Sequence, residues 1–123
     1  MNIVEDIANY LASKNVGVVG QDIIIGSLPD TLDNGIMLTG IGGNTPELNY
    51  RLFYQNIEIW TRNKKTEDGF NKLKSVFDEL HLLSNVQTTN AYIYFIHSLS
   101  DLESAGRDLN GRALHKIIIK ALS

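Results

Sequence analysis

Apolar residues recur at helical spacing in two segments of the chain. In residues 2–14 they return every three or four positions, with acidic and polar residues on the remaining face. The second segment begins at Thr66, and Glu67 and Asp68 follow in the turn where the helix dipole favours negative charge. This pattern predicts two amphipathic helices, the second with Thr66 as its N-cap. The apolar stripe of the second helix consists of Phe70, Leu73, Val76, Phe77, Leu80 and Leu83.

The other apolar segments are short and rich in β-branched and aromatic residues, a composition typical of strands. They are residues 23–25, 36–41, 50–62, 92–97 and 114–122. The resulting order α-β-β-β-α-β-β predicts an α+β fold, in which a mainly antiparallel sheet carries both helices on one face. No linker or repeat interrupts the chain, and 123 residues suffice for one core. We therefore expect residues 1–123 to form a single domain.

The last two predicted strands are joined by a long polar connection, residues 98–112, which we call the terminal arm. A hairpin turn usually needs only about two to five residues, and longer loops in compact domains tend to be functional or disordered. The charged residues of the terminal arm are Asp101, Glu103, Arg107, Asp108 and Arg112. Its length and charge indicate contact with a partner and give no sign of a catalytic pocket.

Aromatic residues gather on the side of two predicted strands that does not look like core. Tyr50, Tyr54 and Trp60 alternate with the apolar side of the third strand, and Tyr92 and Tyr94 share one side of the fourth. Tyrosine and tryptophan are enriched where protein surfaces meet. Two helices can cover one face of the sheet, which leaves the other face without cover. We therefore expect the aromatic residues on that other face to contact a partner. The alternative is that a loop or helix of the same chain covers them.

Two further segments are distinguished by their polar and charged residues. Residues 85–90 are polar and are predicted to be a connection between the second helix and the fourth strand. In the last strand, Lys116 and Lys120 alternate with apolar residues. Regularly spaced lysines are typical of an edge strand, where they resist uncontrolled pairing, so we expect the last strand to lie at a sheet edge.

Composition excludes several function classes. A net charge of −3 and a pI near 5.5 argue against general nucleic-acid binding, which needs a basic face. The chain contains no cysteine, so a disulfide framework, a thiol nucleophile and a thiolate metal site are all ruled out. No apolar run approaches the roughly 20 residues that cross a bilayer. We expect neither specific nucleic-acid binding nor a membrane partner.

Candidate catalytic and metal-binding residues lack the partners that they need. His97 and His115 lie on the last two predicted strands and could meet across them, but no third zinc ligand follows at short spacing. The corner at residues 40–43 (Gly40 to Gly43) loosely resembles a phosphate-binding loop, yet Pro46 follows instead of a helix. We expect no catalytic, cofactor-binding or metal-binding residue. A small α+β enzyme or ligand-binding domain that uses this corner or the two histidines is the alternative.

Several short motifs follow one another in a particular order. They are the N-terminal helix, Leu28-Pro29-Asp30, Gly42-Gly43 with Pro46, residues 57–62 running into the long helix, Ser100-Asp101 and residues 108–112. In this order and spacing, and over essentially its whole length, the chain resembles the tail terminator and minor capsid (head–tail joining) proteins of long-tailed bacteriophages and prophages. The resemblance leaves open whether the role is that of a tail terminator or of a head-side completion protein.

The resemblance implies a structural virion protein without enzymatic activity, made in the host cytoplasm and located at the head-proximal end of the tail. Such proteins form a ring, commonly a hexamer, that caps the tail tube, stops its elongation and joins it to the head–tail connector. The implied partners are further copies of the chain, the tail tube protein and the connector protein. The charged residues of the terminal arm would then pair with opposite charges of a neighbouring subunit. The predicted interface residues are Tyr54, Trp60, Tyr92, Tyr94, Asp101, Glu103, Arg107, Asp108 and Arg112.

Overall fold

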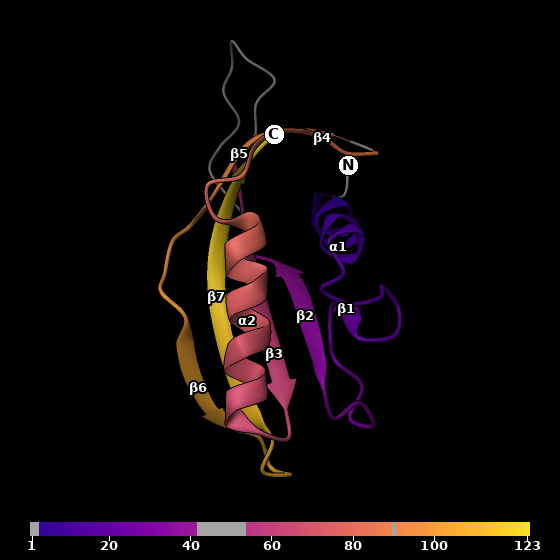
Figure 1. The fold of residues 1–123 in the computed structure, drawn as a ribbon, viewed down its shortest axis with the longest axis vertical. Helices are drawn as coiled ribbons and strands as arrows, with labels where there is room; N and C mark the ends of the chain where they lie inside the picture. Colours follow the sequence, from indigo (N-terminus) through magenta and orange to yellow (C-terminus); the bar gives the residue numbers. More distant parts are fainter. Residues whose placement is uncertain (1–2, 42–53, 90) are drawn as a thin grey trace.

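The computed structural model describes residues 3–41, 54–89 and 91–123, and Figure 1 shows their arrangement as two helices and a seven-stranded sheet. The predicted α+β class is confirmed, and so is the predicted order of elements, apart from two additional strands, β4 and β6. The elements are α1 (Ile3–Ser13), β1 (Ile23–Ile25), β2 (Gly35–Gly40), β3 (Tyr54–Asn63), α2 (Thr66–Leu80), β4 (Ser84–Gln87), β5 (Tyr92–Ser98), β6 (Glu103–Arg107) and β7 (Ala113–Leu122).

The sheet has the strand order β1-β2-β3-β7-β5-β4, and all its pairs are antiparallel except β1 with β2. β7 pairs with β3 along its whole length. On its other side β7 pairs with β6 near its start and with β5 near its end. The prediction that the last strand lies at an edge is therefore wrong. Its lysines do not guard an edge; they lie on the face of the sheet that the helices leave uncovered.

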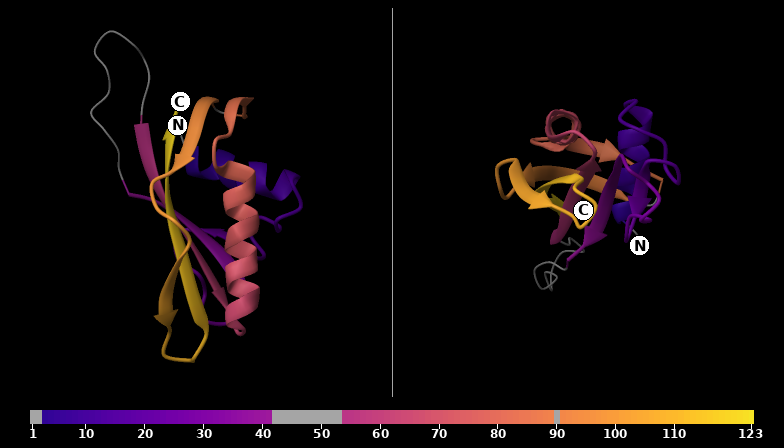
Figure 2. Two further views of the ribbon diagram at one scale, coloured as in Figure 1. Left: turned by 60° about the vertical axis from the view of Figure 1, so that its left-hand side comes forward. Right: turned by 90° about the horizontal axis from the view of Figure 1, so that it is seen from below.

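Both helices pack on one face of the sheet, as the sequence predicted (Figure 2). Alternation along β3 and β7 turns one set of side chains toward the helices. α1 contacts β1 and β2, whereas α2 contacts β3, β5 and β7. The central part of the resulting core consists of Ile7, Leu11, Leu38, Ile57, Ile59, Leu73, Val76, Leu80, Ile96, Ile117 and Ile119.

The start of α2 differs from the prediction. Lys65, in an extended conformation, is the N-cap, and no side chain caps the helix there. Thr66 is the first helical residue, and its Oγ1 accepts a hydrogen bond of 2.9 Å from Arg107. The hydroxyl that was expected to cap α2 is therefore engaged by β6. The helix ends at Leu80, so Leu83 lies beyond it.

The sequence pattern did not predict β4 and β6 because neither strand has an alternating apolar side. The only apolar residue of β4 is Val86, and the only apolar side chain of β6 is that of Ala105. Both become strands because their backbones pair with β5 and β7, a tertiary effect that residue preference does not reveal. The terminal arm is therefore one strand of a β6–β7 hairpin and only in part a loop. Among the described residues, no helix is long and apolar enough to span a bilayer.

Candidate assembly interface

One face of the sheet carries aromatic side chains and is not covered by the helices. Tyr54 and Trp60 alternate with the buried Ile57 and Ile59 and so point away from α2. Tyr54 is 38% exposed. Of the predicted aromatic side, Tyr50 lies outside the described residues. Tyr54 and Trp60 therefore lie on what we call the uncovered face, the side that the sequence pattern predicted for them.

Two lysines of β7 lie over these rings. The Lys120 Nζ is 4.7 Å from the centre of the Tyr54 ring, and the Lys116 Nζ is 5.3 Å from the centre of the Trp60 ring. The indole nitrogen of Trp60 donates a hydrogen bond to Glu58. The attraction between a cation and an exposed aromatic ring is worth about 0.5–1 kcal/mol. These two contacts therefore favour positions of the lysine ammonium groups on the uncovered face. The uncovered face thus combines apolar area with fixed positive charge.

Phe95 joins the uncovered face, although the sequence analysis did not single it out. It is in register with Leu122, and Leu122 is in register with Tyr54, so the three residues form a row across β5, β7 and β3. Phe95 and Tyr54 are each 38% exposed. Strand alternation alone separates Phe95 from its neighbours Tyr92 and Tyr94, and only the pairing with β7 shows which residues it joins.

Tyr92 and Tyr94 lie at the start of β5, where that strand pairs with β4, and form an exposed pair. Their ring centres are 4.9 Å apart in an edge-to-face arrangement. They are 38% and 44% exposed. The Tyr92 hydroxyl donates a hydrogen bond of 3.3 Å to Asn85 on β4. The two rings therefore pack against each other and leave apolar area accessible.

A loop of the same chain covers the other end of the uncovered face. The Arg62 side chain is buried, and its Nη2 donates hydrogen bonds to the carbonyl oxygens of Pro29 and Leu32. The sequence left open the alternative that a segment of the same chain covers this side of the strands. That alternative applies only to the end of β3 where Arg62 lies. The exposed part of the face, around Tyr54, is at the opposite end of β3.

Arg112 is engaged within the subunit, whereas it was expected to pair with an acid of a neighbour. Its side chain is 5% exposed, and it contacts carboxylate oxygens of Asp30 at 2.7 Å, Asp108 at 2.8 Å and Asp33 at 3.4 Å. Burial lowers the pKa of Arg112, but the hydrogen bonds to Asp30 and Asp108 outweigh this effect, so the guanidinium pKa is raised. Arg112 therefore anchors the end of the terminal arm to residues 30–33.

Asp108 and Arg107 also bond within the subunit. The Asp108 carboxylate accepts hydrogen bonds from the backbone N–H groups of Asn110 and Arg112. Although burial raises the pKa of Asp108, its hydrogen bonds with Arg112 and Asn110 lower the pKa below its usual value. Arg107 donates to the Gly111 carbonyl at 2.7 Å. The charges of Arg107, Asp108 and Arg112 thus shape the turn at residues 108–112, which we call the β6–β7 turn.

Asp101 and Glu103 remain exposed on the terminal arm. Asp101 accepts a hydrogen bond from the Leu102 backbone, and Glu103 is in register with Lys116. Leu109, at the tip of the β6–β7 turn, is fully exposed and was not singled out from the sequence. The only sequence signal for Leu109 is an apolar residue in the otherwise polar run Arg107-Asp-Leu-Asn-Gly111.

The two histidines of the alternative reading do not meet. His97 is in register with Lys120, whereas His115 is in register with Thr61 and Ser104. His115 is buried against Phe70 of α2, on the face opposite Lys116 and Lys120. Within the described residues no group of three or more acidic or histidine side chains could hold a metal ion. Gly42 and Gly43 of the predicted corner lie outside the described residues.

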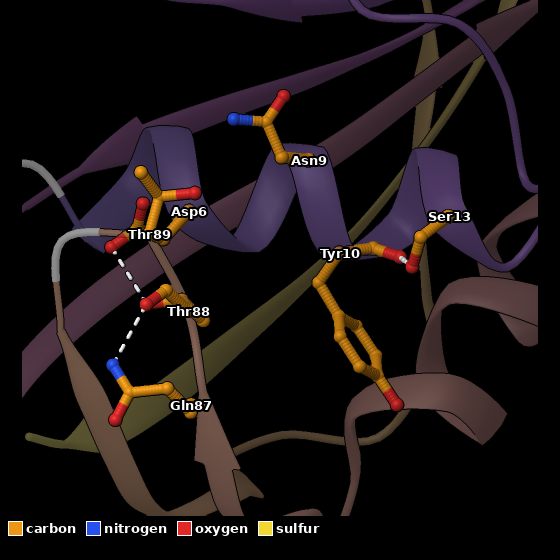
Figure 3. A pocket seen from close by; sticks show the side chains of 7 residues that line it. All are labelled: Asp6, Asn9, Tyr10, Ser13, Gln87, Thr88 and Thr89. Atoms are coloured by element: carbon orange, nitrogen blue, oxygen red, sulfur yellow. Dashed lines mark hydrogen bonds between the residues drawn. The ribbon is translucent and has the colours of Figure 1, made fainter.

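A polar cavity of about 220 Å³ lies between α1 and the end of β4 (Figure 3). The Thr88 hydroxyl donates a hydrogen bond of 2.9 Å to the buried carboxylate of Asp6. This bond connects α1 with the β4–β5 hairpin. Ligand sites usually enclose about 300–1,000 Å³, so the cavity is small for a cofactor or metabolite. The remaining residues that line it are Asn9, Tyr10, Ser13, Gln87 and Thr89.

Comparison with known proteins agrees with an assembly role. The model of a family described as bacteriophage tail terminator protein matches residues 10–122. A search of curated proteins finds no significant match.

Proposed function

The chain belongs to the bacteriophage tail terminator protein family and is a structural protein of the virion, and we propose that it forms a ring on the end of the tail tube. In this proposal the ring is a hexamer and lies at the head-proximal end of the tail. It stops elongation of the tube and joins the tail to the head–tail connector after assembly in the host cytoplasm. The family match over most of the chain carries the proposal.

The uncovered face supports the proposal because it is suited to a protein partner. The rings of Tyr54 and Phe95 are exposed, and the charge of Lys120 lies over the Tyr54 ring. Aromatic residues are enriched in protein interfaces, and charges around an apolar patch set the orientation of a partner. In an isolated subunit this area faces water. We propose that a neighbouring subunit covers it in the ring.

The two candidate surfaces differ from each other, which suits a ring. The uncovered face carries Lys116 and Lys120, whereas the exposed part of the terminal arm carries Asp101 and Glu103. A contact between two different surfaces is heterologous, and it generates a closed ring when the rotation between subunits closes. In the proposed ring, the acids of one terminal arm approach the lysines of the next subunit.

The remaining predicted interface residues fall into two sets with different roles in the proposal. The first set provides apolar contact area for a neighbouring subunit, the tail tube protein or the connector protein, and it consists of Trp60, Tyr92 and Tyr94. The second set holds the β6–β7 turn in the conformation that a neighbour would contact, and it consists of Arg107, Asp108 and Arg112.

The first test is the molar mass of the purified protein by light scattering, with and without the tail tube protein. We expect a ring, or a monomer that becomes a ring on tube ends. A protein that stays monomeric and ignores tube ends would refute the proposal. Point substitutions suit this test better than removal of residues 103–109, because that deletion would take away the strand that covers the start of β7.

Electron microscopy of particles made without this protein separates the two finer roles. A tail terminator is needed to stop the tube, so its absence should give tubes of uncontrolled length. A head-side completion protein is needed only for joining, so its absence should give tails of normal length without heads. We expect the overlong tubes. Normal tails that fail to join heads would assign the protein to the head side instead.

A further inference from the structure

The tip of the β6–β7 turn presents one apolar side chain. Leu109 is fully exposed, with 105% of the reference area accessible. The charged neighbours of Leu109 are engaged within the subunit, Arg107 with Gly111 and Asp108 with Arg112. The turn therefore offers a partner mainly the Leu109 side chain, because the side chains that flank it are held by bonds within the subunit.

Hydrogen bonds fix the position of Leu109. The backbone N–H of Asp108 donates to the Arg112 carbonyl, and that of Gly111 donates to the Asp108 carbonyl, both at 3.0 Å. The Asn110 N–H donates to the Asp108 carboxylate, also at 3.0 Å. A group that is held in place before binding loses little conformational freedom when it binds. Leu109 is in this sense preorganised for contact.

An apolar patch lies at the other end of the same sheet. It is the row Tyr54–Leu122–Phe95 on the uncovered face, which we call the apolar patch. β7 runs from Ala113, next to the turn, to Leu122 in the patch, which is about 30 Å at ~3.3 Å per residue. Figure 1 shows the connection between β6 and β7 at the end of the molecule opposite the C-terminus. Leu109, which lies in this connection, therefore cannot reach the apolar patch of its own subunit.

The charges around the two features are complementary. Acids outnumber bases in the terminal arm, which ends in the β6–β7 turn. The acids are Asp101, Glu103 and Asp108, and the bases are Arg107 and Arg112. On the uncovered face beside the patch, Lys116 and Lys120 outnumber Glu58. Opposite net charge on two surfaces favours their association and fixes its orientation.

We propose that Leu109 of one subunit packs into the apolar patch of the next copy of this chain. The contact joins two different surfaces, so repetition of it around an axis yields a ring. This inference rests on the proposed ring and names the residues that hold its subunits together. Arg107, Asp108 and Arg112 act on the contact as positioning residues, because they fix the turn.

Disulfide crosslinking tests the contact directly, because the chain has no cysteine of its own. In the double variant Leu109→Cys/Phe95→Cys, assembled on tail tube ends and oxidised, we expect a ladder of covalent multimers on a denaturing gel. A disulfide requires the two Cα atoms to lie within about 7 Å, so only a close contact gives the ladder. The matched control is Leu109→Cys/Val18→Cys, since Val18 is also exposed, at 51%, but lies in the α1–β1 connection.

A second measurement does not depend on oxidation. Leu109→Asp should weaken ring formation by about ten- to a hundred-fold, the range expected when one buried leucine side chain is lost from a contact. Val18→Asp should leave ring formation unchanged. A ring that tolerates Leu109→Asp and gives no Leu109–Phe95 crosslink would overturn this inference while the proposed ring stands. A wild-type protein that forms no ring at all would overturn both.

Discussion

The carboxylate of Asp108 accepts two hydrogen bonds from Arg112, one from the backbone N–H at 2.9 Å and one from the side-chain Nε at 2.8 Å. Through this pair the turn between β6 and β7 is closed by a buried arginine. The other nitrogens of that arginine reach Asp30 and Asp33. A residue that the sequence placed in a loop for contact with a partner is therefore a structural anchor of the tail terminator subunit.

We expect Arg112→Ala to lower the denaturant midpoint of unfolding clearly. The substitution removes the guanidinium that bonds to the Asp108 carboxylate and to the carbonyl oxygen of Asp30, and loss of a buried charged partner is strongly destabilising. Lys64→Ala is the matched control, because Lys64 also pairs with Asp33 but both side chains are exposed. Urea titrations of the two variants check this, and equal midpoints would contradict it.

The pH dependence of stability should contain a contribution from His115. Burial lowers the pKa of the imidazole below its ordinary value of 6.5, which the unfolded chain retains. As the pH falls through 6.5 the unfolded chain takes up a proton before the folded protein does, so the free energy of unfolding decreases. Denaturant titrations between pH 7.5 and pH 5 measure this loss.

The control for that measurement is His115→Leu, which has no imidazole to titrate. Its free energy of unfolding should fall less than that of the wild type over the same interval. The pH interval of these titrations stays above the range in which Asp108, whose pKa is lowered, takes up a proton. Parallel pH profiles of the two proteins would show that His115 contributes nothing.

Gly69→Ala in α2 should destabilise the protein, against the usual trend for a helix. A Cβ atom at this position would lie 2.9 Å from the His115 Nδ1. Overpacking of this kind typically lowers stability by about 1–3 kcal/mol, whereas a tolerated glycine-to-alanine change raises it by about 0.4–1 kcal/mol.

Thermal and denaturant unfolding of Gly69→Ala, His115→Ala and the double variant form a thermodynamic cycle. His115→Ala removes the ring that the new Cβ would meet. The alanine at position 69 should therefore be much less harmful, or even stabilising, in that background. If Gly69→Ala lowers stability equally in both backgrounds, the close approach to His115 is not the reason.

Ring formation should weaken when the charge of Lys120 is reversed. In Lys120→Glu the cation over the Tyr54 ring becomes an acid, which would repel Asp101 and Glu103 of the next subunit in the proposed ring. The matched control is Lys14→Glu, because Lys14 also lies over a tyrosine, Tyr10, but on α1. Light scattering at low and high salt measures the effect, and an equal loss in both variants would argue against a specific role of Lys120.

Much of the fold could be predicted from the sequence, because the periodicity of helices and the alternation of strands are both local properties. The stripe that contains Leu73, Val76 and Leu80 identifies α2 and its buried side, and the alternation around Ile57 and Ile59 does the same for β3. Phe70, also predicted in the stripe, is 43% exposed. The position of Tyr54 and Trp60 opposite the core follows from the same alternation. The resemblance of the motif order to tail terminators was also sufficient to indicate the family.

The pairing of strands could not be predicted in the same way. Glu103 to Arg107 has no apolar side, so only hydrogen bonding to β7 makes it a strand. The lysines of β7 resemble those of an edge strand, yet β7 is central because it pairs with β3 on one side and with β5 and β6 on the other. Its lysines lie instead over Trp60 and Tyr54 on the uncovered face. The Thr66 hydroxyl looked like a helix cap, but Arg107, distant in sequence, engages it.

By itself the sequence determined which segments are helical, which strands are half-buried, and that aromatic residues lie on the side away from the core, because each of these depends on spacing between near neighbours. Only the tertiary structure decided that Arg112 is buried among acids, that Phe95 lines up with Leu122 and Tyr54, and that Leu109 is fully exposed at the turn. These features depend on strand register and on contacts between residues far apart in the chain, which no local pattern records.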